Sequence, residues 1–129
     1  MPPNHLSPDD PRAWLNRAKG NLALAKSGIT EAYLEDLCFE AQQAAEKAIK
    51  AVMIRRNIEF PYVHDLARLL SILEAQGESV PLMVRKAEEL TRYALITRYP
   101  GFARPVSAQE HAEAVAIAEE VIQWAEERI

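Results

Sequence analysis

The chain has 129 residues, a formal net charge of −4 at pH 7, 49% hydrophobic residues and 26% charged residues. These values fit one soluble globular domain with its own core, and the acidic balance argues against non-specific nucleic-acid binding. A single cysteine excludes an internal disulfide, no apolar run is long enough to span a membrane, and the first residues lack the layout of a secretory signal, so we expect a cytoplasmic protein.

The first half of the chain predicts two helices. Asp10 followed by Pro11 is a favourable helix start, and apolar residues then recur at helical spacing until Gly28, a natural stop. A second, long helix is expected from about Thr30 to about Arg56, with an alanine-rich apolar face that lets a neighbouring helix approach closely.

Residues 58–62 read as an extended connector, because Pro61 interrupts regular helix. A short helix is expected after Asp65, ending near Gly77. Pro81 opens another helix, whose candidate core residues are Val84, Ala87, Leu90 and Ala94, and Pro100 with Gly101 breaks the chain again.

The last helix has the clearest start, because Ser107 and Glu110 have the spacing of a capping box. Its expected apolar face consists of Ala112, Val115, Ala118, Ile122, Ala125 and Ile129. Four main helices and one short helix predict an all-α, up-and-down bundle.

Charge is unevenly distributed along the chain. The stretches 47–68 and 85–104 each carry five basic residues and two acidic ones, whereas residues 105–129 carry six glutamates and one arginine. Solvated helix faces explain this pattern simply. The alternative is that the two basic stretches meet in space and form an anion-binding surface.

The segment 97–106 combines arginines, aromatic residues, prolines and a glycine between the last two helices. Loops on a rigid scaffold often carry function. Alternatively, Tyr99 and Phe102 plug the end of the bundle while Arg98 and Arg104 bond to helix carbonyls.

No histidine stands at a recognised zinc spacing from Cys38 or a carboxylate, and no phosphate-binding glycine motif occurs, so we expect no metal and no cofactor. Cys38 lies in an apolar helical stripe and is expected in the core.

Three motifs resemble those of small prokaryotic HEPN-domain proteins. Residues 39–50 (FEAQQAAEKAIK) resemble the signature helix, residues 64–70 (HDLARLL) resemble the next motif, and Tyr93 with Arg98-Tyr99-Pro100 resembles the third. Their order and spacing agree with the family over nearly the whole chain. The resemblance implies one HEPN-like helical domain over residues 1–129.

HEPN proteins usually form homodimers and are often encoded beside a minimal nucleotidyltransferase, as toxin and antitoxin. Many members are metal-independent ribonucleases, and others bind nucleotides or are catalytically silent. The resemblance therefore implies a homodimer that acts on RNA or nucleotides with a nucleotidyltransferase partner. It leaves enzymatic activity open, and a non-catalytic module that binds a nucleotide or the partner is the alternative.

The ribonuclease branch carries an arginine a few residues ahead of a histidine at the start of the final helix. Arg104 and His111 match this pattern and are the candidate catalytic pair. Two departures are the proline at position 105, where active members usually carry a small polar residue, and the lack of a tyrosine shortly after His111. By the same resemblance, the expected nucleotide- or RNA-binding residues are His64, Arg92, Tyr93, Arg98 and Tyr99.

Overall fold

The computed structural model describes residues 5–96 and 105–129, and the regular elements in these ranges are all helical. They are α1 (Pro11–Ala25), α2 (Leu34–Arg55), α3 (Leu66–Ala75), α4 (Leu82–Arg85), the 3₁₀ helix η1 (Lys86–Leu90), α5 (Thr91–Ile96) and α6 (Ala108–Glu126). This confirms the predicted all-α fold.

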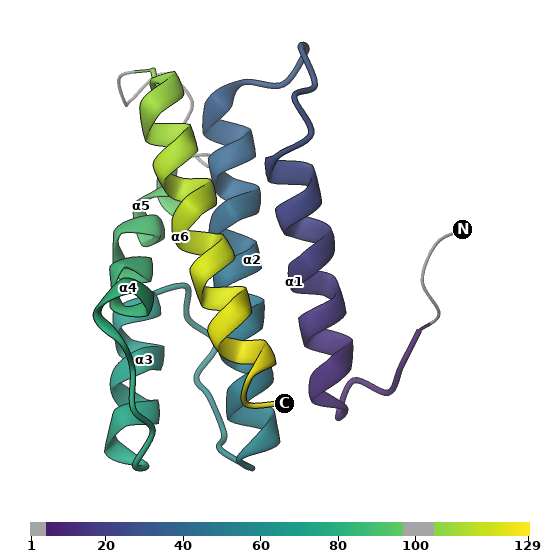
Figure 1. Ribbon diagram of the computed structural model, residues 1–129, viewed down its shortest axis with the longest axis vertical. Coiled ribbons are helices and arrows are strands. Elements are labelled where there is room, and N and C mark those ends of the chain that lie inside the picture. The colour runs from purple at the N-terminus through teal and green to yellow at the C-terminus, as the bar shows by residue number, and fades with distance from the viewer. Residues whose placement is uncertain (1–4, 97–104) are drawn as a thin grey trace.

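The long helices lie side by side (Figure 1). In that view α1 runs upward, α2 returns beside it, and α6 descends in the same direction as α2; both α1 and α6 pack on α2. The shorter elements α3, α4 and α5 stack along one side of the bundle. The third long helix of the predicted up-and-down bundle is thus built from α4, η1 and α5 in succession.

Helix α2 is the centre of the core. Its fully buried alanines are Ala41, Ala44, Ala45, Ala48 and Ala51. Alanine loses no rotamer freedom on burial and presents only a methyl group, so the backbones of neighbouring helices can approach α2 closely. Cys38 and Ile49, on the same helix, are also fully buried, which confirms Cys38 as a core residue.

Three of the predicted helix starts, those with a capping residue, are confirmed. Asp10 accepts a hydrogen bond from the Arg12 amide at the start of α1, and Asp65 accepts one from the Ala67 amide at the start of α3. Ser107 and Glu110 form both hydrogen bonds of a capping box at α6. Each such cap is worth about 1 kcal/mol of stability.

Two helices end in a left-handed residue. After α2, Asn57 has φ 57° and the Ile58 amide donates to the Met53 carbonyl; after α3, Gly77 has φ 95° and the Glu78 amide donates to the Leu73 carbonyl. Both are Schellman ends, which satisfy carbonyls that the helix leaves without partners. The connector that follows the first of these two ends runs back along α2 and carries His64.

The structure corrects two predicted helix boundaries. The second helix begins at Leu34 rather than near Thr30, because a turn bonded from the Ala32 amide to the Ile29 carbonyl occupies the preceding residues. The helix expected after Pro81 is broken at 86–90 by a 3₁₀ segment. Buried residues there recur every third position, at 84, 87, 90 and 93, which matches the three residues per turn of a 3₁₀ helix.

The predicted apolar face of the last helix is partly wrong. Ala112 is exposed, and Ala114, Val121 and Trp124 are buried in its place. The buried face follows the spacing 114, 118, 121, 125, and Ala112 lies off that stripe.

Candidate functional site

A buried polar network lies on one face of α2. Gln42, Glu46 and Lys50 follow one another at intervals of one helical turn, and all three are buried. Oxygens of the Glu46 carboxylate accept hydrogen bonds from Gln42 Nε2 at 3.0 Å, Lys50 Nζ at 3.0 Å and His64 Nδ1 at 2.9 Å. Glu46 therefore connects three polar side chains within the bundle.

The surroundings of this network favour its charged state. The Lys50 ammonium lies 5.0 Å from the ring centroid of Phe60 and 6.0 Å from that of Trp14, within the range of cation–π attraction. Burial opposes ionisation of Glu46, but the hydrogen bonds from His64, Lys50 and Gln42 hold its pKa below the ordinary value. The network thus contains a buried ion pair between Glu46 and Lys50.

His64 reaches this network from the connector between α2 and α3, and its side chain is 44% exposed. A carboxylate only accepts hydrogen bonds, so the His64 nitrogen that faces Glu46 carries a proton. In the neutral ring Nε2 is then the basic nitrogen. The sequence placed His64 among the binding residues but missed its partner Glu46, although a glutamate four residues from a lysine inside an alanine-rich face was a usable signal.

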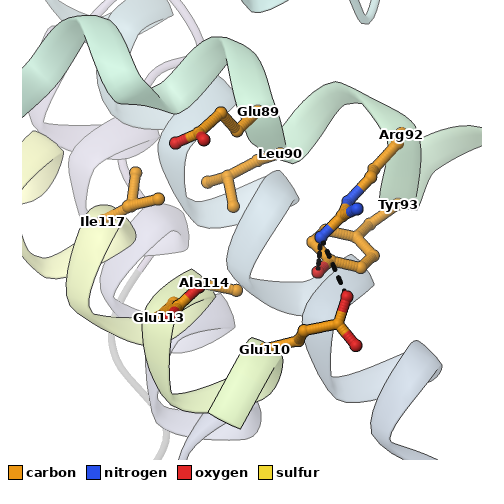
Figure 2. Close-up of a pocket in the computed structure, with 8 residues that line it drawn as sticks. All are labelled: Glu89, Leu90, Arg92, Tyr93, Glu110, Glu113, Ala114 and Ile117. Carbon is orange, nitrogen blue, oxygen red and sulfur yellow. Dashed lines mark hydrogen bonds and ion pairs between the residues drawn. The ribbon is translucent and has the colours of Figure 1, made fainter. Parts of the chain in front are cut away.

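A second cluster joins α5 to the first turn of α6, as Figure 2 shows. Arg92 Nη2 donates to the Tyr93 hydroxyl at 2.7 Å and lies 3.4 Å from Glu110 Oε2. Its guanidinium carbon sits 4.8 Å from the centroid of the Tyr93 ring. The predicted binding residues Arg92 and Tyr93 are therefore in contact, and Glu110 holds them against α6.

Tyr93 is 2% exposed, and its burial raises the pKa of the phenol, an effect that the hydrogen bond from Arg92 opposes. Beside it lies a small cavity of about 40 Å³, lined by apolar Leu90, Ala114 and Ile117 and by the acidic Glu89 and Glu113 (Figure 2). This volume is enough for a few water molecules.

His111 occupies the first turn of α6, next to Glu110 in the chain. Its Nε2 lies 2.7 Å from the carbonyl oxygen of Ala25, the last residue of α1. A carbonyl only accepts, so Nε2 carries a proton and Nδ1 is the basic nitrogen of the neutral ring. The contact with Ala25 thus fixes the orientation of the half-buried His111 imidazole. The ion pair between Arg92 and Glu110 brings Arg92 to the same turn of α6.

The other predicted site residues, Arg98, Tyr99 and Arg104, lie outside the described residues, as does Phe102. His64 and His111 contact different parts of the fold, the middle of α2 and the end of α1. Over residues 5–96 and 105–129, no group of three or more metal-binding side chains is gathered, and no helix is long and apolar enough to cross a membrane.

The model of the HEPN domain family matches residues 11–128, which is most of the chain. This chain belongs to the HEPN domain family. The resemblance seen in the three sequence motifs is therefore confirmed.

Two solved structures are similar to this HEPN chain. The crystal structure of TT1696 from Thermus thermophilus is 30% identical, with a TM-score of 0.82, over 94% of this chain and 99% of that one. ST0689, described as an archaeal HEPN homologue, is 23% identical, with a TM-score of 0.71, over 92% of this chain and 96% of that one, and it supports the fold.

One curated relative carries a functional name. The protein called "Putative toxin MJ1304", from Methanocaldococcus jannaschii, is 26% identical over 95 residues, which cover 69% of this chain and 62% of that protein. The matched region is less than two thirds of the relative's length. The name of the relative refers to that whole protein.

Proposed function

We propose that this HEPN chain is the toxin of a toxin–antitoxin pair, that it acts on RNA or nucleotides as a homodimer, and that its antitoxin partner is a minimal nucleotidyltransferase. Membership of the HEPN family and similarity to a relative named as a toxin support this proposal. The proposed activity is metal-independent endoribonuclease cleavage.

The observation that carries the proposal is the arrangement of the first turn of α6. The Ala25 carbonyl orients the His111 ring, and the adjacent Glu110 holds Arg92 at the same turn. An oriented imidazole and a guanidinium held by the neighbouring residue of the same helical turn are the two kinds of group that RNA cleavage without a metal requires, a proton carrier and a donor to phosphate oxygens. Arg104, seven positions before His111, is the proposed second cation.

In the proposed reaction, His111 takes the proton of a ribose 2′-hydroxyl through Nδ1, and the 2′-oxygen attacks the adjacent phosphorus. The bond to the 5′-oxygen breaks, and that oxygen takes a proton from water. The products are a 2′,3′-cyclic phosphate and a 5′-hydroxyl end. Arg104 stabilises the negative charge that develops on the phosphate, for which the fork of guanidinium donors is well suited.

The test is cleavage of RNA by the purified protein in EDTA. His111→Ala is expected to reduce the rate at least about 100-fold, since general acid–base catalysis contributes that much or more. Gln109→Ala, an exposed change in the same helical turn, is the matched control and should leave the rate unchanged. Thermal unfolding of both variants checks their fold, and cleavage that survives His111→Ala would refute the proposed site.

A second candidate function, non-catalytic binding of a nucleotide or of the partner, is favoured by one observation. The Nε2 of His111 is engaged with the backbone of α1, and Arg92 is stacked on a buried tyrosine, so both groups have structural contacts of their own. This candidate predicts no cleavage, but binding of ATP, GTP or the partner that weakens with salt and in Arg98→Ala. Binding unaffected by both would exclude the segment 97–106 from the interface.

The homodimer is tested separately by analytical ultracentrifugation at working concentration. A mass of twice 14.5 kDa is expected. A particle with the mass of one chain would contradict the proposed homodimer.

A further inference from the structure

The segment from α4 to α5 combines a local sequence that favours one structure with a backbone that adopts another. Residues 82–96 contain neither glycine nor proline, and Lys86–Leu90 (KAEEL) consists of residues that favour the α-helix. These five residues nevertheless form the 3₁₀ helix η1. A 3₁₀ helix has poorer hydrogen-bond geometry than an α-helix and is uncommon beyond about three or four residues. Tertiary packing therefore imposes the 3₁₀ form on η1.

The packing responsible is the burial of Leu90 and Tyr93, which are 1% and 2% exposed. Three residues per turn bring the buried positions 84, 87, 90 and 93 to one face of the segment. In an α-helix the same four positions would spread over about half a turn. The 3₁₀ form is thus the one that places both Leu90 and Tyr93 in the core.

The same residues in an α-helix would present a second uncharged face to the core. An α-helix turns by about 100° per residue and a 3₁₀ helix by about 120°, so over the length of η1 the two differ by about 100°, which is one residue position. Thr91, Ala94 and Leu95 would then face the core, and Leu90 and Tyr93 would turn outward. Leu95 is an apolar side chain that is 54% exposed in the observed state, so this rotation would bury it.

The contacts of the two flanking helices indicate which of them would move. Arg85, the last residue of α4, donates to two side chains of α3, at 2.7 and 3.1 Å. The contacts of α5 are longer, because the Leu66 amide donates to the Thr91 hydroxyl at 3.2 Å and Arg92 lies 3.4 Å from Glu110. Hydrogen bonds weaken with length. A change of register in η1 would therefore turn α5 and leave α4 in place.

This rotation would give Arg92 a different partner. Arg92 would take the direction that Thr91 has in the observed state, toward the start of α3. The N-cap residue there, Asp65, carries a carboxylate. The guanidinium would exchange Glu110 for Asp65, and the Tyr93 phenol would take the outward direction that Arg92 has in Figure 2.

We propose that residues 86–96 form a two-state register switch that moves Arg92 between α6 and α3. In the observed state η1 is a 3₁₀ helix, Tyr93 is buried and Arg92 lies at the turn that carries His111. In the second state the segment is α-helical, Leu95 is buried and Arg92 faces α3. The second state removes the guanidinium from the site of the proposed ribonuclease, and only this regulatory consequence rests on the proposed function.

NMR spectroscopy of the full chain tests whether both states exist. Nuclear Overhauser contacts from the α-proton of residue i to the amide of residue i+2 mark a 3₁₀ helix, and contacts to residue i+4 mark an α-helix. The i+2 contacts should dominate over residues 86–90. Nitrogen-15 relaxation dispersion, which detects motion on the microsecond to millisecond timescale, should show exchange in residues 86–96 and none in α4.

Three single variants test the direction of the switch. Thr91→Val removes a hydroxyl that the second state would bury without its partner, so it should raise the population of that state about tenfold. Leu95→Gln should lower the population by a similar factor, because an amide would be buried in place of an apolar side chain. Leu82→Gln makes the same change at an exposed position of α4 and should leave the exchange unaltered.

A fourth variant, Leu90→Thr/Thr91→Leu, exchanges two neighbouring residues and keeps the composition. It rewards the α-helical register, so the i+4 contacts should replace the i+2 contacts over residues 86–92. Tyr93 should then become reactive toward tetranitromethane, with the nitrated residue identified by mass spectrometry. In the unaltered chain, Tyr62, which is 99% exposed, should be nitrated and Tyr93 protected.

Persistence of the 3₁₀ contacts in the exchanged variant, with Tyr93 still protected, would overturn the inference. If that variant fails to fold, the relaxation measurements decide. The absence of exchange in both the unaltered chain and Thr91→Val, or equal effects of Leu95→Gln and Leu82→Gln, would also overturn it. RNA cleavage without register exchange contradicts the switch alone, and register exchange without RNA cleavage contradicts the proposed function alone.

Discussion

The imidazole of His64 donates from Nδ1 to Oε1 of Glu46 over 2.9 Å, so that an exposed connector is anchored to a buried carboxylate in the middle of α2. The same carboxylate holds Lys50 and Gln42. Glu46 is therefore the residue on which the polar interior of this bundle depends, and it lies within the signature helix that first indicated the family.

Glu46→Gln is expected to destabilise the fold by about 3 kcal/mol. The neutral side chain leaves the buried Lys50 ammonium without its anion, and breaking a buried ion pair from one side is costly. Glu40→Gln, on the same helix but bonded to a neutral amide, should cost less than about 1 kcal/mol. Urea denaturation of both variants measures the difference, and equal losses would contradict the central place given to Glu46.

Stability should also depend on pH through Glu46. Its folded pKa lies below the unfolded value, so its contribution is present above the ordinary glutamate pKa of about 4.3 and is lost as the pH falls through the folded pKa. The free energy of unfolding should therefore decrease on acidification below that value. The decrease should be shallower in Glu46→Gln, and parallel curves for the two proteins would refute the assignment.

Glu110 has two functions that one pair of variants separates. One of its oxygens accepts from the Ser107 amide in the capping box, and the other faces Arg92 at 3.4 Å. Glu110→Gln keeps an acceptor for the cap and loses the charge, so it should cost less than about 1 kcal/mol, because partly exposed ion pairs are weak. Glu110→Ala loses both and should cost about 1–2 kcal/mol. Thermal unfolding distinguishes these outcomes, and equal effects would mean that the charge dominates.

The Cys38 thiol should be almost inert in the folded protein. Burial raises its pKa to about 11, against a weaker opposing effect of the hydrogen bond with Tyr93. Since the thiolate is the reactive form, labelling by iodoacetamide at pH 8 should be at least about 100-fold slower than in urea-unfolded chain. Mass spectrometry follows the reaction, and rapid labelling under native conditions would show that this part of α2 opens readily.

Three of the helix starts were predictable, because the residues that cap them act locally. Asp10, Asp65 and the pair Ser107 and Glu110 each act within a few residues of their own position. The 3₁₀ segment after Pro81 was not predicted, although its buried residues recur every third position. Over so short a stretch, spacings of three and four residues are both compatible with an ordinary α-helix. The Thr91 hydroxyl directly follows the 3₁₀ segment and accepts a hydrogen bond from the Leu66 amide at the start of α3. No local sequence pattern reveals this contact.

The candidate site was predictable to a smaller degree. Arg92, Tyr93, His64 and His111 were identified from motifs, but their partners were not, because Glu46, Glu110 and the Ala25 carbonyl are brought to them by tertiary packing.

The order in which the helices are made has a consequence for synthesis in the cell. The alanine face of α2 is covered in part by α6, and these helices are separated by more than fifty residues. A nascent chain must therefore expose this face on the ribosome until α6 has left the exit tunnel. Packing of this face is therefore completed only when α6 is available, and until then the nascent chain is a natural substrate for chaperones that bind apolar helices.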